Sequence, residues 1–303
     1  MRVVVTGGAG FLGSHLVDLL LENGDEVLVI DDLSRGHREQ VDSRAIFFEA
    51  NICDPGVISS KCVEFNPDVI HHLAAVNGTR RFHRQADLVV DVNINGTRSA
   101  IAAAKACDSR LVFYSSPEAF GEQESMPLAN SSESLFPPAH LHQRHSYGAS
   151  KYLGELMCHH AITNGVDVRI VRPFNVYGPR LHGDNDGQVV AMMISSARST
   201  GIIEVHGTGE QTRSLTWIGD VTPGLEKIGR LDNLSGMSFN LGSLEEIKMI
   251  DLANLIAQKT DATLQFVESN HGDSNRRLPD LSMNHHLDWA ASTKLEDGLN
   301  QLL

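Results

Sequence analysis

Two observations in the sequence predict an α/β fold, a doubly wound parallel sheet of the Rossmann type with a smaller C-terminal lobe. Short β-branched runs alternate with helix-like segments along the first 172 residues, which is typical of parallel strands joined by helical crossovers. A glycine-rich turn separates the first strand from the first helix, as at the start of dinucleotide-binding sheets. The 303 residues are enough for one large unit with an appended lobe.

The glycine-rich turn lies in the sequence VVVTGGAGFLG, after a strand that ends at Thr6 and before a helix that runs through Leu21. Gly7 permits a sharp turn, Gly10 lets the backbone approach phosphates, and Gly13 lets the helix pack closely on the strand. The helix N-terminus offers free N–H groups to an anion. The turn therefore predicts a site for a dinucleotide pyrophosphate.

A second strand is predicted over 26–30 and ends at Asp31. An acid about 20 residues beyond the glycine turn accepts hydrogen bonds from the adenosine ribose and favours NAD over NADP. The alternative is a glycine turn that holds no cofactor. The strand before the turn, the helix after it and the acid at this distance favour the cofactor site.

The remaining elements of this half continue the alternation. Strands are predicted over 45–48, 68–71, 111–114 and 168–171, and helices over 57–65, over 87–106 and from near Tyr147. An irregular, proline-containing stretch over 115–146 follows one of these strands. We expect it at the carboxyl ends of the strands, where open α/β sheets bind their ligands.

From residue 173 onward the sheet pattern gives way to loops rich in Gly and Pro, the segment 188–199, short strands near Ile203 and Arg213, and two or three further helices. We therefore predict an NAD-binding Rossmann domain over 1–172 and a mainly substrate-binding lobe over 173–303. Elements near 203–240 are expected to return to the first domain.

Composition excludes several classes of function. The net charge of -13 argues against nucleic acid as a partner, because phosphate binding over a broad surface needs a basic face. The four cysteines have no metal-ligand spacing, and we expect reduced, mostly buried thiols. The first strand begins at Arg2 and no apolar run is long enough to span a bilayer, so we expect a cytoplasmic protein without a signal peptide.

A pair of side chains in the sequence SYGASKYLGE can perform proton transfer. Tyr147 and Lys151 lie four residues apart at the start of a predicted helix, so they share one face. An ammonium close to a phenol lowers the phenol's pKa and makes it a usable base. By itself such a pair is more often a solvated surface pair. Here the strand over 111–114 brings Ser115 and Ser116 to the same edge, and with a nicotinamide these groups form a hydride-transfer site for an alcohol.

Many further motifs occur in order along the chain. They are TGGAGFLGSHL, DDLSRG, ANICD, HHLAA, VNINGT, SSPEAFG, YGASK, RPFNVYGPR, GTGEQTRSLTWIGDV, NLGS and RRLPD. Over nearly its whole length the chain resembles the extended short-chain dehydrogenase/reductases, within the NAD-dependent nucleotide-sugar epimerase, dehydratase and decarboxylase family.

The resemblance implies that Ser116, Tyr147 and Lys151 are catalytic and that NAD is the cofactor. Tyr147 would take a proton from a sugar hydroxyl, and Lys151 would hold the nicotinamide ribose. Asp31 and Asp32 would bind the adenosine ribose. The implied cofactor-binding set is Gly7, Gly10, Phe11, Leu12, Gly13, Asp31, Asp32, Asn51, Ile52, Leu73, Ala74, Ala75, Asn93, Tyr147, Lys151 and Pro173.

The resemblance also implies a nucleotide-linked sugar as substrate, with UDP favoured among the nucleotides. Asn175 and Arg213 match positions that hold the nucleotide diphosphate, and a guanidinium suits a phosphate because it can donate two parallel hydrogen bonds. Arg277 matches an arginine that reaches the sugar and the diphosphate in the decarboxylases. The implied substrate-binding set is Arg80, Ser116, Asn175, Val189, Arg213 and Arg277.

Glu118 distinguishes the possible reactions and is counted with the catalytic set. Dehydratases and glucuronate decarboxylases of the family tend to carry glutamate there, because a carboxylate beside a keto sugar can relay a proton. In the alternative, Glu118 caps a local turn or faces solvent. Pro117 and Phe120 depart from the decarboxylase pattern. We therefore predict decarboxylase-like or dehydratase-like chemistry through a 4-keto intermediate, with a 4-epimerase as the alternative and a non-catalytic NAD-sensing protein as a remote one.

Three histidines, His140, His142 and His145, lie close together before Tyr147. Imidazole is a common metal ligand, but no acidic or thiolate partners accompany these histidines. We therefore predict no metal site and regard them as loop histidines.

The helices over 87–106 and 147–163 carry small and apolar residues on faces that look exposed. In the family the equivalent helices form a four-helix bundle, so a homodimer is expected.

Overall fold

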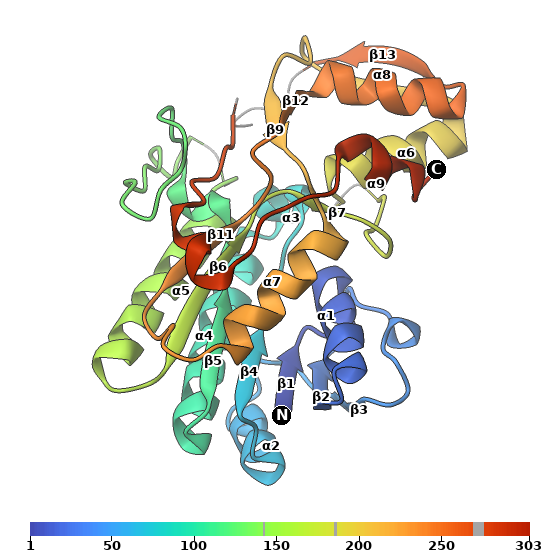
Figure 1. The fold of residues 1–303 in the computed structure, drawn as a ribbon. Helices are drawn as coiled ribbons and strands as arrows, with labels where there is room; N and C mark the ends of the chain where they lie inside the picture. The colour runs from blue at the N-terminus through green and yellow to red at the C-terminus, as the bar shows by residue number, and fades with distance from the viewer. Residues whose placement is uncertain (142, 185–186, 269–275) are drawn as a thin grey trace.

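The computed structural model of the protein describes residues 1–141, 143–184, 187–268 and 276–303. Its largest element is a seven-stranded sheet in the order β11-β6-β5-β4-β1-β2-β3, in which all neighbours are parallel (Figure 1). The strands are β1 (Arg2–Thr6), β2 (Glu26–Asp31), β3 (Ile46–Glu49), β4 (Val69–His72), β5 (Arg110–Tyr114), β6 (Val168–Pro173) and β11 (Ser238–Leu241). The predicted fold class is confirmed.

The strand order reverses between β1 and β4. Successive strands from β1 proceed to β3 on one side, and those from β4 proceed to β6 on the other. At such a switch point the connections leave the sheet in opposite directions, and the crevice outside the carboxyl ends of the strands binds ligands. The glycine turn follows β1, so the topology places it at this crevice.

The apolar character of β1 explains its central position. Val3 and Val5 contribute to one hydrophobic cluster and Val4 to another, and each is at most 2% exposed. Successive side chains of a strand point to opposite faces, and both faces of a parallel sheet are covered. A strand in the middle of a parallel sheet is therefore apolar at successive positions, and the continuous β-branched run of β1 has this pattern.

Helices cover the two faces of the sheet (Figure 1). On one face lie α1 (Phe11–Glu22) and α7 (Ile218–Arg230). On the other lie α2 (Val57–Phe65), α4 (Ala86–Cys107) and α5 (Ser146–Thr163). None of the helices in the described ranges is long and apolar enough to cross a membrane.

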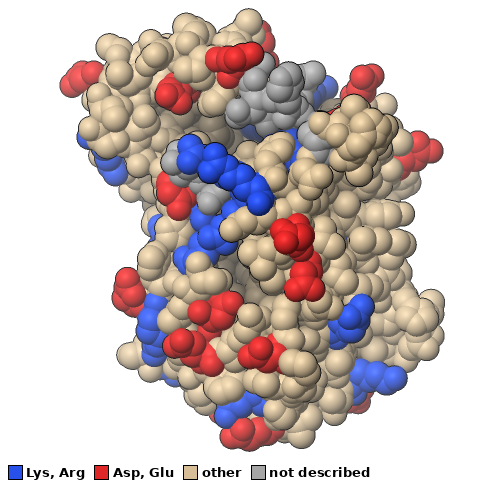
Figure 2. All heavy atoms as spheres, turned by 180° about the vertical axis from the view of Figure 1, so that it is seen from behind, with Lys and Arg blue, Asp and Glu red and all other residues tan. Residues whose placement is uncertain are grey.

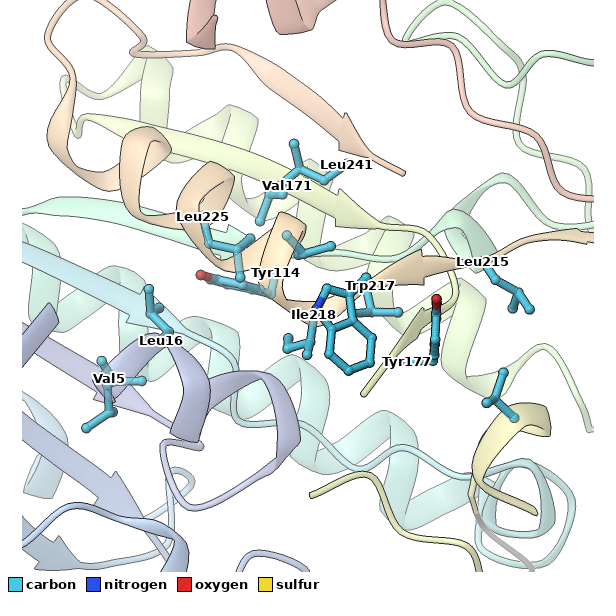
Figure 3. Close-up of a cluster of buried hydrophobic side chains, with 14 of the residues drawn as sticks. Val5, Leu16, Tyr114, Val171, Tyr177, Leu215, Trp217, Ile218, Leu225 and Leu241 are labelled. Atoms are coloured by element: carbon cyan, nitrogen blue, oxygen red, sulfur yellow. The ribbon is translucent and has the colours of Figure 1, made fainter. Parts of the chain in front are cut away.

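The hydrophobic core on the α1 and α7 side continues from the large sheet into the smaller part of the molecule. Val5, Leu16 and Leu225 belong to the same cluster as Tyr177 and Trp217 (Figure 3). The ring centroids of Tyr177 and Trp217 lie 5.4 Å apart in an edge-on arrangement, which is a favourable geometry for aromatic pairs. The smaller part is therefore packed on the sheet through a shared core.

The smaller part contains three short two-stranded sheets. β7 (Val176–Tyr177) pairs with β10 (Thr216–Trp217), β9 (Thr212–Ser214) with β12 (Glu246–Lys248), and β8 (Ile202–His206) with β13 (Thr263–Val267). The accompanying helices are α6 (Val189–Thr200), α8 (Met249–Thr260) and α9 (Leu295–Asn300). Short 3-10 helices occur at η1 (Arg38–Gln40), η2 (Pro117–Phe120) and η3 (Ser282–Leu287).

Within 203–240, α7 and β11 pack on or join the large sheet, whereas the strand near Ile203 pairs with β13. No helix is predicted from the sequence over 76–86, but this segment contains α3 (Thr79–Arg84). Phe82, which is 7% exposed, holds this helix in place by packing in one cluster with Val89 and Tyr147.

Candidate active site

The glycine turn is built so that side chains are excluded. Gly7 has a φ of +72°, which L-residues with a Cβ rarely adopt. A Cβ at Gly7 would lie 2.7 Å from the Ala74 amide nitrogen, and one at Gly13 would lie 2.2 Å from the Gly7 carbonyl oxygen. The first N–H groups of α1 have no intrahelical acceptor. They are available to an anion at the switch point.

Asp31 connects the end of β2 to this turn. Its Oδ2 accepts a hydrogen bond from the Ala9 amide and its Oδ1 accepts one from the Leu33 amide, both at 2.9 Å. The side chain is largely buried, and burial raises the pKa of Asp31 despite these two hydrogen bonds. A carboxylate oxygen has two acceptor positions, so Asp31 can brace the turn and still accept from a ribose hydroxyl.

The other predicted cofactor residues surround the same crevice. Asp32 and Asn51 are exposed, and each side chain accepts a hydrogen bond from a backbone amide two residues on. Ile52 is 6% exposed. Phe11, Leu12, Leu73, Ala74, Ala75 and Pro173 are partly buried. A turn without side chains, a helix N-terminus, a buried carboxylate and an apolar wall together fit a dinucleotide.

Asn93 is engaged with protein groups. Its Oδ1 accepts from the Val76 amide at 2.8 Å, and its Nδ2 donates to the Ser150 hydroxyl at 2.9 Å and to the Val76 carbonyl at 3.3 Å. Asn93 thereby ties the segment after β4 to α5. Its role as a direct cofactor ligand stays a prediction.

Tyr147 and Lys151 lie on α5 and are 9% and 3% exposed. Burial raises the pKa of Tyr147, whereas a hydrogen bond with the Ser116 hydroxyl lowers it. The Lys151 Nζ donates to the Tyr114 carbonyl at 2.7 Å and lies 5.7 Å from the centroid of the Tyr147 ring. Burial is the largest influence on the phenol and raises its pKa, and the role of Lys151 in lowering the pKa of Tyr147 stays a prediction. Burial also lowers the pKa of Lys151 to about 8.

Gly148 explains how η2 reaches the start of α5. A Cβ at Gly148 would lie 2.3 Å from the Glu118 carbonyl oxygen, so only glycine permits this approach. The Ser116 hydroxyl caps η2 by accepting from the Glu118 amide at 3.2 Å. Ser116, Glu118 and Tyr147 are consequently brought together from two segments.

Sequence reasoning did not anticipate a ring that packs against the tyrosine. Phe82 of α3 stacks on Tyr147 with centroids 4.9 Å apart and an interplanar angle of 15°. Phe82 belongs to the sequence RRFHR. A single apolar residue among basic ones is the sequence feature that could have predicted its burial. The stack restricts the orientation of the phenol.

Glu118 faces arginine side chains. Its Oε1 lies 3.6 Å from the Arg277 Nε, and its side chain is 26% exposed. Burial raises the pKa of Glu118, but the charges of Arg277, Arg144 and Arg213 outweigh this effect and lower the pKa below its ordinary value. The carboxylate is therefore ionised at neutral pH. Arg144 lies three residues before Tyr147 and belongs to none of the sequence motifs, so the sequence did not indicate its role.

Arg277 is more deeply buried than the resemblance implied. It is 2% exposed, and its Nη2 donates to the Gly121 carbonyl at 2.6 Å. The Arg277 Nη1 is buried without a hydrogen-bond partner among the described residues. Direct contact of Arg277 with a sugar or a diphosphate stays a prediction.

The remaining predicted substrate residues come from several other segments of the chain. The Arg213 Nη1 donates to the Thr212 carbonyl at 2.8 Å, and the Asn175 Nδ2 donates to the Ser214 carbonyl at 3.4 Å. Val189 begins α6, and Arg80 is exposed on α3. On the face seen in Figure 2, Lys and Arg side chains gather around a hollow between the two parts of the molecule. An acidic chain can thus still offer a basic surface to a small anion.

The predicted histidine cluster is only partly described. His140 is exposed, the His145 Nε2 lies 2.9 Å from the Glu122 Oε1, and His142 lies outside the described residues. His71 and His72 are each 1% exposed. They end β4, and burial lowers the pKa of each to about 3.

Comparison with known proteins gives three informative matches. Residues 3–242 match a family described as the NAD dependent epimerase/dehydratase family. UDP-glucuronic acid decarboxylase 1 of Arabidopsis thaliana is 31% identical over 312 residues, which cover 100% of this chain and 69% of that protein. The UDP-glucose 4-epimerase of Thermotoga maritima, solved with UDP-glucose, has a TM-score of 0.92 and 26% identity, covering 99% of this chain and 97% of its own.

A further structural match was solved with an acidic sugar. The UDP-glucuronic acid 4-epimerase of Bacillus cereus was solved in complex with UDP-glucuronic acid and NAD. It has a TM-score of 0.88 and 27% identity, and the alignment covers 99% of this chain and 97% of that one.

Proposed function

The chain belongs to the NAD-dependent epimerase/dehydratase family, and we propose that it is a UDP-glucuronate decarboxylase. In this proposal the C4 hydroxyl of the sugar is oxidised, the resulting 4-keto acid loses carbon dioxide, and the ketone is reduced again. The relatives named UDP-glucuronic acid decarboxylase support the choice of substrate. The observation that carries the proposal is the position of Glu118 among arginines beside Tyr147.

The charges around Glu118 suit a substrate with a carboxylate. Arg277, Arg144 and Arg213 all act on the Glu118 carboxylate, so several guanidinium groups gather at this point. A diphosphate and a uronate carboxylate are both anions that guanidinium groups bind well. Because charge-assisted hydrogen bonds to guanidinium groups are strong, we assign this cluster to the anionic groups of a nucleotide-linked uronic acid.

We assign the cofactor site to the crevice at the switch point, where Gly7, Gly13 and Asp31 form a cradle that fits NAD. Bound NAD supplies hydride transfer at C4 of the sugar in both directions. Tyr147 takes the proton of the C4 hydroxyl as the C–H bond breaks, and Ser116 donates a hydrogen bond to the developing carbonyl oxygen. The proton returns from Tyr147 to this oxygen in the reduction.

Decarboxylation needs little from the protein once C4 is a ketone, because the substrate is then a β-keto acid. The bond between C5 and the carboxyl carbon breaks, carbon dioxide leaves, and the electron pair passes to the C4 oxygen as an enolate. Tyr147 and Ser116 stabilise this oxyanion. Since the arginines keep Glu118 ionised, we assign it to orient the sugar and a water molecule, and the water delivers the proton to C5.

A 4,6-dehydration is less well supported by these residues. Elimination of water requires an acid for the departing hydroxyl as well as a base for the C5 proton. Pro117, beside Glu118, has no ionisable group, and the pKa of Glu118 is lowered. The second candidate function is a 4-epimerase, which the likeness to two 4-epimerases supports.

Product analysis separates these reactions. Purified protein is incubated with NAD and UDP-glucuronate, and the nucleotide sugars are followed by NMR. We expect release of carbon dioxide and a UDP-pentose that lacks the carboxyl carbon. Retention of the carboxylate with inversion at C4 would replace the proposal by the epimerase, and UDP-glucose serves as the control substrate without a carboxylate.

We also propose that the protein is a homodimer in which α4 and α5 of two copies form a four-helix bundle. Both helices expose large apolar side chains. They are Leu88, Val90, Tyr152, Leu153 and Leu156, with exposed fractions between 37% and 48%. A patch of this kind is unusual on the surface of a monomer and marks an interaction site.

A further inference from the structure

A buried ion pair lies directly behind the candidate active site. Glu155 of α5 and Arg172 of β6 are 7% and 5% exposed. The Arg172 Nε and Nη2 donate to the two Glu155 carboxylate oxygens at 2.7 and 2.5 Å. Such a bidentate contact fixes the orientation of both groups. The chemistry assigned above makes no use of this pair.

Glu155 also holds the segment that presents Ser116. The Ser115 hydroxyl donates to the Glu155 Oε1, and the Ser115 amide donates to the Val171 carbonyl at 2.8 Å. Ser115 is therefore fixed through both its side chain and its backbone. Because Ser116 is the next residue, the direction of its hydroxyl toward Tyr147 depends on this anchor.

The charge of the Glu155 carboxylate also acts on Lys151. Tyr147, Lys151 and Glu155 are spaced by four residues on α5 and therefore share one face. Burial raises the pKa of the nearby Cys158 thiol and lowers the pKa of His72, so both are neutral at pH 7. The other groups around the ammonium are the Phe113 ring, the Tyr114 carbonyl and, beyond Glu155, Arg172. Among these groups Glu155 supplies the negative charge.

We propose that Glu155, held by Arg172, is a positioning residue that keeps Lys151 protonated and directs the Ser116 hydroxyl to Tyr147. The proposal rests on the proposed function only for the roles of Lys151 and Ser116. The protonation of Lys151 can be measured in the protein without any substrate, so failure of the proposal and failure of the decarboxylase assignment are distinguishable.

The sign of the effect follows from the surroundings of Lys151. Burial lowers the pKa of Lys151 to about 8, and the charge of Glu155 raises it in opposition to burial. Removal of the Glu155 carboxylate takes away a charge that favours the protonated lysine, so the pKa of Lys151 falls further. At pH 7.5 a larger fraction of the lysine is then neutral and cannot hold a ribose hydroxyl as an ammonium.

The experiment is an NMR titration of lysine side chains labelled with ¹³C at Cε, with Lys151→Met used to assign the Lys151 signal. In the wild type we expect a titration midpoint near pH 8. In Glu155→Gln we expect the midpoint to fall by at least about half a pH unit, because a nearby charge has been removed. The matched control is Glu64→Gln, which removes an exposed acid paired with Lys61 and leaves the midpoint unchanged.

Two conservative variants separate charge from anchoring. Glu155→Asp keeps the charge but has a shorter reach, and Ser115→Ala removes the hydroxyl that Glu155 accepts. Both are expected to keep the Lys151 midpoint within about 0.3 pH units of the wild type while kcat falls and KM for the nucleotide sugar is unchanged. A merely structural role would lower Tm in these variants without separating kcat from KM.

A folded Glu155→Gln protein with an unchanged Lys151 midpoint would overturn the proposal. Loss of one partner leaves the other buried and unpaired, which is strongly destabilising, so Glu155→Gln could fail to fold. In that case the variant Glu155→Gln/Arg172→Gln removes both charges, and a smaller fall of the midpoint is expected, because the loss of the more distant positive charge of Arg172 offsets part of the effect. An unchanged midpoint in this folded double variant overturns the proposal equally.

Discussion

Tyr147 illustrates how the surroundings of a single side chain set its chemistry. Burial raises the pKa of the phenol, the Ser116 hydroxyl lowers it, and Phe82 restricts the ring from one side. Lys151 donates to the Tyr114 carbonyl, and its Nζ lies 5.7 Å from the centroid of the Tyr147 ring. Tyr147 must give up its own proton before it can take the proton of the sugar hydroxyl, so any influence that lowers the pKa of the phenol favours the oxidation step.

Tyr147→Phe should reduce kcat by about 10²- to 10⁴-fold, the usual contribution of one general acid–base group. The ring and its stack on Phe82 are kept, so Tm and NAD binding should stay near the wild type. Single-turnover absorbance at 340 nm measures the oxidation step. Full activity of this variant would remove Tyr147 from the mechanism.

His71 and His72 should make the fold sensitive to acid. The pKa of each is about 3 in the folded protein and about 6.5 in an unfolded chain. Between these values the unfolded chain binds more protons, so stability is complete above pH 6.5 and falls as the pH decreases. The slope is about 1.4 kcal/mol per pH unit for each histidine.

Urea unfolding between pH 7 and pH 4.5 measures this dependence. His71→Gln should flatten the slope, although it also loses the contact of the ring with the Tyr114 hydroxyl. His159→Gln is the control, because His159 is exposed on α5 and should leave the slope unchanged. An equal slope in both variants would contradict the assignment.

Among the elements, η2 and α5 have the closest contact at the site. Ser116 at the start of η2 accepts from the Glu118 amide, and Gly148 lets the Glu118 carbonyl approach α5. Ser115, which follows β5, fixes the other end of this arrangement. Its amide donates a hydrogen bond to the Val171 carbonyl of β6. The geometry of the catalytic groups is thus set by packing between elements as much as by each element.

Gly148→Ala should displace η2, because the added Cβ would lie 2.3 Å from the Glu118 carbonyl oxygen. We expect kcat to fall by at least about tenfold, since small displacements of catalytic groups are costly, with only a moderate loss of Tm. The matched variant is Gly154→Ala on the same helix, whose Cβ would instead meet the Phe113 ring at 2.5 Å. That variant should lower Tm more than kcat, and the reverse pattern would contradict this account.

The molecule as a whole combines an acidic surface with local basic groups at one hollow (Figure 2). Net negative charge favours solubility and disfavours broad binding to nucleic acid. Five exposed large apolar residues lie on α4 and α5. This distribution separates the surface assigned to the substrate from the surface assigned to a second copy.

Leu156→Glu should weaken the proposed homodimer, because it places a charge on a side chain that is 48% exposed in the single chain and would be buried between two copies. Light scattering at micromolar concentration should give the mass of a dimer for the wild type and a lower mass for the variant. Leu244→Glu is the control, since Leu244 is 63% exposed and lies outside both helices. A wild-type mass of 33.1 kDa would remove the dimer proposal.

Local features of the sheet could be predicted because their causes are local. The helix over 57–65 was predicted with the bounds that the structure gives, and β1, β2 and β5 differ by at most one residue from expectation. These segments have continuous apolar runs or clear helical spacing, and glycine or proline marks their ends. The helix α3 was missed because its single apolar residue, Phe82, gains its partners only from α4 and α5.

Candidate residues could be named from motifs, but their partners could not. Arg277 lies 3.6 Å from Glu118 and donates to the carbonyl of Gly121, 156 residues earlier in the chain. The Lys151 ammonium donates to a backbone carbonyl on β5. Such partners depend on which distant segments meet, and a pattern of neighbouring residues does not contain that information.

The order of residues along the chain was sufficient to establish the class of fold, the crevice that follows β1 and the identity of most candidate site residues, since turns and periodic runs act over a few positions. The place of β11 at the edge of the large sheet, the depth of Arg277 and the Glu155–Arg172 pair behind Lys151 emerged only from the folded chain. Burial and charge are properties of surroundings assembled from distant segments. For that reason the pKa values of the site groups followed their surroundings rather than their motif.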